Sequence, residues 1–313
     1  MAIYNSILET IGKTPLVRIN KINDSEAEVL VKIESFNPLG SSKDRVAFNM
    51  IERAEKEGKL KPGALIIEPT SGNTGVGLAY VGAVKGYKVV LTMPDSMSME
   101  RRLLLKALGA EVVLTEGAKG MAGCIEKANE IAAQNPGSFI PQQFENPANP
   151  EAHYLTTGPE IWADTEGKVD VFIATAGTGG TVSGTAKFLK EKNPNVYVIA
   201  IEPDDSPMIS KGVAGPHKIQ GIGANFVPKI YDPKVVNEVY LTSTEKAGKA
   251  AREAAAKEGI FVGISSGAAI SFAFSMQPAM PFAPSVSTTS APSAFKSICR
   301  STLMESGIVS TTL

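Results

Sequence analysis

The chain has few of the residues that build metal sites or disulfide frameworks. Its 313 residues include only two cysteines, Cys124 and Cys299, and two histidines, His153 and His217. These residues cannot make a disulfide framework or a convincing zinc site, so we expect no metal. Cys124 lies in a helical pattern, where a small packed residue is the simpler interpretation than a nucleophile.

The chain also lacks net charge and long apolar runs. Its 31 Lys and Arg nearly balance 32 Asp and Glu, and the net charge of -1 offers no electrostatic basis for binding nucleic acid or an anionic membrane. The first residues lack the basic and apolar regions of a signal peptide, and no apolar run is long enough to span a membrane. We therefore expect a cytoplasmic protein that acts on small molecules. With 43% hydrophobic residues, it can bury the cores of two domains.

Short β-branched runs alternate with helical patterns along most of the chain. This alternation predicts an α/β fold with mostly parallel, twisted sheets flanked by helices. Strands are expected at residues 28–33, 64–69, 88–93, 111–114, 169–174, 196–201 and 236–241, and helices at about 76–84, 98–108 and 244–257. Residues 145–150, which include two prolines and two asparagines, interrupt the alternation and predict a crossing between domains.

One turn delivers a lysine to the start of a predicted helix. In residues 35–45, Asn37-Pro38 and Gly40 favour a turn, and two serines that follow can cap a helix from about Lys43. The partial positive charge of a helix N-terminus disfavours an ammonium group, which favours the neutral amine that Schiff-base chemistry with a carbonyl cofactor needs. For a lysine taken alone, a surface position on an amphipathic helix is much the commoner explanation, and only the loops further along the chain favour the chemical role.

Three loops rich in glycine and hydroxyl residues follow predicted strands, where open parallel sheets bind their ligands. The first, Thr-Ser-Gly-Asn-Thr-Gly at 70–75, places donors at a helix N-terminus and suits a carboxylate. The second, Gly-Thr-Gly-Gly-Thr at 177–181, lets backbone amides converge on a phosphate dianion. The third, Gly-Ile-Ser-Ser-Gly at 263–267, is explained by a serine pair at a helix cap.

The second loop has alternative interpretations. A Walker loop is excluded because no Lys-Ser or Lys-Thr pair ends it. A dinucleotide fingerprint would use Glu202, at the end of the next strand, as its ribose-binding acid, but Val182 stands where the third glycine is required. A nicotinamide-dependent oxidoreductase and a purely structural turn therefore stay open at this point.

In this order, the lysine turn and the three loops resemble the cysteine synthase (O-acetylserine sulfhydrylase) family over about residues 3–270. Further segments that look like this family are residues 11–16, 97–102, 142–149, 157–162 and 220–224. The resemblance implies the β-family (fold type II) of pyridoxal phosphate enzymes, a homodimer with two α/β domains and the cofactor between them. We expect a smaller domain at 35–145 and a larger one made of 1–34 and 146–270.

The resemblance also implies residue roles. Lys43 would be the Schiff-base lysine and general base of a pyridoxal 5'-phosphate enzyme. Asn73 would bind the phenolic oxygen of the cofactor, and Ser265 would face its pyridine nitrogen, where a neutral hydroxyl favours β-elimination. The cofactor phosphate would be held by Gly177, Thr178, Gly179, Gly180 and Thr181. The substrate α-carboxylate would be bound by Thr70, Ser71, Asn73 and Gln143.

The implied activity is β-replacement, which makes L-cysteine from O-acetyl-L-serine and sulfide in cysteine biosynthesis and sulfur assimilation. A cystathionine β-synthase-like enzyme would use homocysteine in place of sulfide. An O-phosphoserine-using enzyme is disfavoured because no arginine stands in the recognised loops, and we expect the paired arginines Arg101 and Arg102 to lie on a solvated helix face. A catalytically poor paralogue that binds serine acetyltransferase is a further alternative, and that protein is a candidate partner.

Residues 271–313 depart from the family. They are rich in Ser, Thr, Ala and Pro, and they lack the alanine-rich helix, the apolar strand and the Gly-Glu-Arg-Tyr sequence that the family implies. Composition predicts a disordered tail, and a reading frame shifted after about Ile270 would also explain the change. A missing strand and helix would uncover apolar surface of the larger domain, which puts folding and activity in question.

Overall fold

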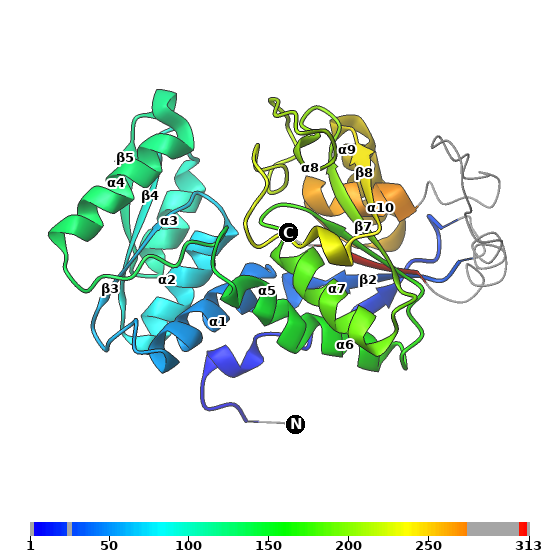
Figure 1. Cartoon of the computed structure of the whole chain (residues 1–313), viewed down its shortest axis with the longest axis horizontal. Helices are drawn as coiled ribbons and strands as arrows, with labels where there is room; N and C mark the ends of the chain where they lie inside the picture. The colour runs from blue at the N-terminus through cyan, green and yellow to red at the C-terminus, as the bar shows by residue number, and fades with distance from the viewer. Residues whose placement is uncertain (1–2, 24–26, 274–306, 312–313) are drawn as a thin grey trace. The chain divides into compact units, whose positions relative to one another are not determined.

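The computed structural model describes residues 3–23, 27–273 and 307–311. The chain divides into two compact units, and Figure 1 labels most of their helices and strands. Unit 1 consists of Met1–Lys13 and Ser35–His153, and unit 2 consists of Thr14–Glu34 and Tyr154–Leu313. No helix within the described ranges is long and apolar enough to cross a membrane.

Unit 1 is organised around a parallel sheet that, among the described residues, has three strands in the order β3-β4-β5. The strands are β3 (Leu65–Pro69), β4 (Lys88–Pro94) and β5 (Glu111–Thr115). The α-helices are α1 (Lys43–Lys56), α2 (Asn73–Lys85), α3 (Met99–Ala107), α4 (Gly120–Gln134) and α5 (Ala148–Ala152). Short 3-10 helices are η1 (Ile7–Thr10), η2 (Glu34–Phe36), which begins at the unit boundary, and η3 (Gly117–Lys119).

Both faces of this sheet are buried, because successive strand side chains point to opposite sides and helices cover each side. Ile66 and Leu91 belong to the larger core, which they share with residues of α1 and α2. Ile67 and Val90 belong to a smaller core, which they share with Ala128 of α4. This packing fixes the strands, and so it also fixes the points at which the loops at their carboxyl ends begin.

Unit 2 contains, within the described residues, a six-stranded sheet in the order β1-β2-β9-β6-β7-β8. Its strands are β1 (Leu16–Arg18), β2 (Val29–Ile33), β6 (Val171–Thr175), β7 (Tyr197–Pro203), β8 (Glu238–Thr242) and β9 (Gly307–Thr311). Only β1 among these runs antiparallel to its neighbour, and it lies at the sheet edge. The helical segments are α6 (Gly158–Asp164), α7 (Gly180–Lys192), α8 (Met208–Lys211), η5 (Pro233–Val235), α9 (Thr244–Glu253), α10 (Ile264–Ala273), and the π-helical turns η4 (His153–Thr157) and η6 (Ala254–Glu258).

The sheet of unit 2 is also covered on both faces. Ile173 and Ile199 pack in a core with residues of α9 and α10, whereas Phe172 and Val198 pack in a second core with residues of α6 and α7. The α/β class predicted from the sequence is therefore confirmed. Every strand predicted between residues 28 and 241 is present as one of β2 to β8, and the helix predicted from about Lys43 begins at that residue.

Strand β9 was not predicted. It pairs in parallel with β2 on one side and with β6 on the other, so it fills the middle of the sheet and satisfies backbone groups of both neighbours. The prediction of a disordered tail over 271–313 is therefore wrong for Gly307–Thr311, and it is also wrong for residues 271–273, which form the end of α10. The rest of the predicted tail, residues 274–306 and 312–313, lies outside the described residues, and the reading-frame hypothesis stays untested.

Two segments that the sequence assigned to the larger domain lie in unit 1. Leu8 is buried in the core of unit 1, and the Gly12 amide donates a hydrogen bond of 2.8 Å to Asn37 Oδ1, which ties residues 1–13 to the lysine turn. Asn49 Nδ2 of α1 donates a hydrogen bond of 2.7 Å to the carbonyl of Ala148 in α5. The segment at 145–150 is thus anchored in unit 1, and the chain leaves this unit after His153.

Candidate active site

The lysine turn positions Lys43 as the first residue of α1. The Gly40 amide donates a hydrogen bond of 2.8 Å to the carbonyl of Asn37, and Gly40 has a φ of +80°, a conformation that glycine adopts without strain. Of the two serines expected to cap the helix, Ser42 holds the N-cap position but makes no capping bond with its side chain, whereas Ser41 Oγ accepts a hydrogen bond of 3.2 Å from the Lys43 amide. Lys43 is half-buried, and the turn fixes the position of its backbone in unit 1.

Helix α2 packs directly against the first turn of α1. A Cβ on Gly77 would lie 2.8 Å from the carbonyl oxygen of Lys43 and 2.9 Å from the Cβ of Ala47. Only glycine allows this approach, and the contact fixes the backbone that carries Lys43. Because α2 begins at Asn73, the same packing sets the distance between the lysine turn and the loop 70–75.

The loop 70–75 meets Gln143 in unit 1. Gln143 Nε2 donates a hydrogen bond of 3.4 Å to Thr70 Oγ1, and Thr74 Oγ1 donates one of 2.5 Å to Gln143 Oε1. The Gly72 amide donates a further bond of 3.2 Å to Thr70 Oγ1. The predicted residues Thr70 and Gln143 are therefore in direct contact, and Ser71 and Asn73 lie on the same loop.

Two residues beside this loop were missed by sequence reasoning. Glu68, at the end of β3, is 1% exposed and accepts hydrogen bonds from the amides of Gln142 and Gln143. Burial raises the pKa of the Glu68 carboxyl to about 7, and these two backbone hydrogen bonds oppose the shift. Arg101 Nη1 donates a hydrogen bond of 3.4 Å to Asn73 Oδ1, so its expected place on a solvated face is corrected. An acidic residue in an otherwise apolar strand was the one signal for Glu68.

In unit 2, the loop 177–181 connects β6 to the N-terminus of α7. Gly179 is the N-cap residue of α7, with a φ of +83°. The N-terminus of a helix is a place where backbone amides and the helix dipole suit an anion. The Gly180 amide donates a hydrogen bond of 3.3 Å to Thr178 Oγ1. Thr178 and Thr181 are buried, so the loop is packed in place rather than exposed.

The same loop lies against the segment 220–224 and Ser265. A Cβ on Gly177 would lie 2.4 Å from the carbonyl oxygen of Gly221, and a Cβ on Gly221 would lie 3.7 Å from Ser265 Oγ. The Gly223 amide donates a hydrogen bond of 3.1 Å to the carbonyl of Ala176, the residue that follows β6. Unit 2 thus brings together the predicted phosphate loop and Ser265, the second residue of α10.

Glu202 does not have the arrangement that a dinucleotide fingerprint requires. Its Oε2 accepts a hydrogen bond of 2.8 Å from the Ile209 amide, and its Oε1 accepts one of 2.9 Å from the Ser210 amide. Both carboxylate oxygens are used by backbone of unit 2, and the side chain is 1% exposed. No ribose hydroxyl is accommodated in this arrangement, which removes the main support for a nicotinamide enzyme.

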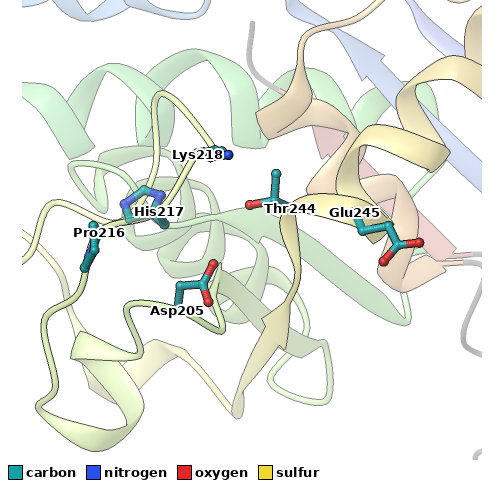
Figure 2. A pocket seen from close by; sticks show the side chains of 6 residues that line it. All are labelled: Asp205, Pro216, His217, Lys218, Thr244 and Glu245. Carbon is teal, nitrogen blue, oxygen red and sulfur yellow. The ribbon is translucent and has the colours of Figure 1, made fainter.

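A pocket of about 570 Å³ in unit 2 neighbours this region, and Figure 2 shows it with the side chains of Asp205, Pro216, His217, Lys218, Thr244 and Glu245. None of the predicted site residues lines it. His217 Nε2 lies 2.9 Å from the carbonyl oxygen of Gly223, so the pocket adjoins the segment that contacts Gly177. Across the described ranges, no group of His, Cys, Asp and Glu side chains could hold a metal ion.

The donor set of these loops fits pyridoxal phosphate. Gly177 lies so close to the carbonyl of Gly221 that only a residue without a Cβ fits, and this contact fixes the loop 177–181 against the segment 220–224. Amides and hydroxyls at the start of α7 are donors that suit a phosphate dianion. The half-buried Lys43, at the start of α1, supplies the amine that a carbonyl cofactor requires.

Comparison with known proteins agrees with this chemistry. A family model described as pyridoxal-phosphate dependent enzyme matches residues 7–285. The chain belongs to this family. Cysteine synthase from Staphylococcus aureus is 54% identical over 268 residues, which cover 85% of this chain and 86% of that protein. The resemblance to cysteine synthases, the fold type and the cofactor implied by the sequence are thereby confirmed.

Two solved structures extend the comparison. A hydrogen sulfide-producing enzyme from Fusobacterium nucleatum aligns with a TM-score of 0.88 and 43% identity, covering 100% of this chain and 97% of that chain. Cysteine synthase from Entamoeba histolytica aligns with a TM-score of 0.87 and 42% identity, covering 99% of this chain and 88% of that chain.

Proposed function

We propose that the protein makes L-cysteine and acetate from O-acetyl-L-serine and sulfide. The observation that carries this proposal is the 54% identity to a cysteine synthase over 85% of the chain. The family match at residues 7–285 includes every residue proposed for the site. The product belongs to cysteine biosynthesis, and the cytoplasmic location expected from the sequence stays a prediction.

Lys43 is the proposed catalytic residue. When bound, pyridoxal phosphate acts as an electron sink that makes the α-proton of an amino acid acidic. The Lys43 amine would link to the cofactor carbonyl in the resting enzyme and, once released by the substrate amine, take the proton from Cα. Acetate then leaves from Cβ, and sulfide forms the new carbon–sulfur bond there. The close contact at Gly77 fixes the first turn of α1 against α2. It therefore fixes the backbone of Lys43 relative to the loop 70–75.

The loop 70–75 and Gln143 would bind the substrate α-carboxylate. Thr70, Ser71 and Asn73 provide donors at the N-terminus of α2, whose partial positive charge favours a carboxylate. Gln143 is held on this loop by its contacts with Thr70 and Thr74. Orientation of the carboxylate by several fixed donors points Cα toward the base and excludes water from the reacting carbon.

Unit 2 would bind the cofactor at two points. The amides and hydroxyls of Gly177, Thr178, Gly179, Gly180 and Thr181 would hold the phosphate at the N-terminus of α7. Ser265 would face the pyridine nitrogen with a neutral hydroxyl. Because Ser265 is not a carboxylate, it would not hold a proton on that nitrogen, and this favours β-elimination.

The leaving group and the direction of sulfur transfer each have an alternative. Arg101 contacts Asn73, so an arginine does lie near the proposed site and O-phosphoserine stays an alternative donor. A second candidate is release of sulfide from L-cysteine, which the similarity to the hydrogen sulfide-producing enzyme favours. A homodimer and binding of serine acetyltransferase are further proposals that the resemblance supports.

The test uses purified protein and a Lys43→Ala variant. We expect wild-type protein to bind pyridoxal phosphate with a visible absorption band and to form cysteine faster from O-acetylserine than from O-phosphoserine. Lys43→Ala should lose this band and several orders of magnitude in turnover, because covalent and acid–base roles are lost together. Lys56→Ala is the matched control, since Lys56 ends the same helix with a side chain 77% exposed. Near-normal turnover in Lys43→Ala would refute the assignment.

A further inference from the structure

Glu68 makes a contact that the reaction as described does not use. Its Oε2 accepts a hydrogen bond of 2.9 Å from the Gln142 amide, and its Oε1 accepts one of 3.1 Å from the Gln143 amide. Both carboxylate oxygens thus bind two successive backbone amides. Because each amide binds a different oxygen, the ionised carboxylate suits this arrangement best, since protonation turns one of the two oxygens into a hydroxyl donor.

The segment that Glu68 binds needs such an anchor. Gln142 has a φ of +57°, a left-handed conformation that is uncommon for a residue with a side chain. The amides of Glu145 and Asn146 both bind the carbonyl of Gln142, which makes this residue the start of a tight turn. Without the two bonds to Glu68, residues 142 and 143 would relax toward ordinary conformations.

Gln143 transmits this anchoring to the proposed substrate loop. Its side chain bonds with Thr70 and Thr74, and its carbonyl accepts a hydrogen bond of 2.8 Å from Asn149 Nδ2. Because Glu68 is followed directly by Pro69 and Thr70, the same stretch of chain carries both the anchor and the loop. A displacement of Gln143 relative to Glu68 is therefore a displacement relative to Thr70.

We propose that ionised Glu68 is a positioning residue that fixes Gln143 on the loop 70–75, so that protonation of Glu68 weakens binding of the substrate carboxylate. This inference rests on the proposed function for its substrate and deepens it by adding a pH-dependent element of the same site. In the protonated form one oxygen becomes a hydroxyl that faces a backbone N–H donor, and one of the two anchoring bonds is lost.

The titration falls in an accessible pH range. Burial in the sheet of unit 1 is the largest cause that raises the pKa of Glu68 to about 7, the amides of Gln143 and Gln142 lower it, and no charged side chain is among the causes. Below this pH the group is protonated and KM for O-acetylserine should rise. Above it the group is ionised and KM should reach its low plateau.

The test is Glu68→Gln, which has the shape of the protonated side chain at every pH. We expect KM for O-acetylserine to rise about tenfold at pH values above the titration, the effect of one lost hydrogen bond to a charged group, with kcat changed less than twofold. The wild-type dependence of KM on pH near 7 should disappear in the variant. Adding Gln143→Ala to Glu68→Gln should raise KM less than the two separate effects predict, because both act through one contact.

Hydrogen exchange in protein without cofactor gives a second measurement that does not depend on activity. Amides 142 and 143 should exchange about tenfold faster in Glu68→Gln than in wild type. Glu202→Gln is the matched control, because Glu202 is equally buried and binds the amides of Ile209 and Ser210. It should accelerate exchange at 209 and 210 and leave 142 and 143 unchanged.

The outcomes separate this inference from the proposed function. If wild-type protein makes no cysteine from O-acetylserine, the proposed function fails, and hydrogen exchange at 142 and 143 still decides whether Glu68 is the anchor. Unchanged exchange in Glu68→Gln would refute the inference. If the variant does not fold, the wild-type pH profile decides, and a KM that is constant from about pH 6 to about pH 8 would contradict the positioning role.

Discussion

Gly177→Ala should weaken cofactor binding because its new methyl group meets backbone. The added Cβ would lie 2.4 Å from the carbonyl oxygen of Gly221, whereas carbon–oxygen contacts of this kind are comfortable at about 3.3 Å. The two segments must therefore separate by roughly 1 Å. No side chain can rotate away to make space, since the atoms next to the added Cβ, the Gly221 carbonyl and the Ile222 Cα, belong to the main chain.

Overpacking of this size costs about 1–3 kcal/mol, which corresponds to about 5- to 150-fold weaker binding when the displaced segment is the ligand cradle. The assay is titration of cofactor-free protein with pyridoxal phosphate, followed by visible absorption. Gly248→Ala in α9 of the same unit is the control, since its Cβ would meet only the end of the Arg252 side chain, at 3.3 Å. An alanine in that helix should be neutral or stabilising by up to about 1 kcal/mol.

The result that would refute this reasoning is an affinity of Gly177→Ala within twofold of wild type. Thermal unfolding of both cofactor-free variants separates a folding defect from a binding defect. If Gly177→Ala unfolds at the wild-type temperature and binds the cofactor weakly, the strain is confined to the loop 177–181. If its unfolding temperature falls sharply, the contact with Gly221 supports the whole of unit 2.

Three further predictions test other parts of the structure. Lys32→Met should lower the free energy of unfolding, measured in urea, by about 3 kcal/mol. The reason is that the buried Lys32 Nζ lies 2.9 Å from Glu160 Oε2, and the variant leaves this carboxylate without that cation. Adding Glu160→Gln to Lys32→Met should restore part of the loss. Val309→Pro should lower the free energy of unfolding by about 3 kcal/mol or more, because it removes an N–H from the middle of the sheet; unchanged stability in this variant would contradict the pairing of β9. Arg101→Leu should weaken pyridoxal phosphate about fivefold, because the guanidinium orients the Asn73 amide, and Arg102→Leu is its control; equal affinities would argue against this role.

Local sequence patterns predicted the parts of the site that depend on neighbouring residues. The start of α1 at Lys43 follows from a turn and from Ser41, whose hydroxyl binds the Lys43 amide, and both act within a few residues. The loops 70–75 and 177–181 follow from glycine and hydroxyl residues placed between a strand and a helix, where anions bind. These features are visible in one sequence because their chemistry is carried by adjacent residues.

Contacts between distant residues could not be predicted in this way. Glu68 and Gln143 are brought together because the chain around Phe139 runs beside β3, with hydrogen bonds between Phe139 and residues 65 and 67. No local pattern specifies that pairing. The same reason explains the assignment of residues 1–13 to unit 1 and the place of β9 in the sheet, which depend on long-range pairing rather than on composition.

The two units use a buried glutamate in the same manner. Glu68 lies in β3, Glu202 lies in β7, and each accepts hydrogen bonds from two successive amides of a later segment. A carboxylate near the carboxyl end of a parallel strand is well placed for this, because the strand fixes its backbone and the connecting loops lie at that edge. What differs is the segment held. The amides bound by Glu68 belong to Gln142 and Gln143, whereas those bound by Glu202 belong to a short helix with no proposed site residue. A loss of charge at either position should therefore disturb local structure, but only the loss at Glu68 should change how the enzyme recognises its substrate.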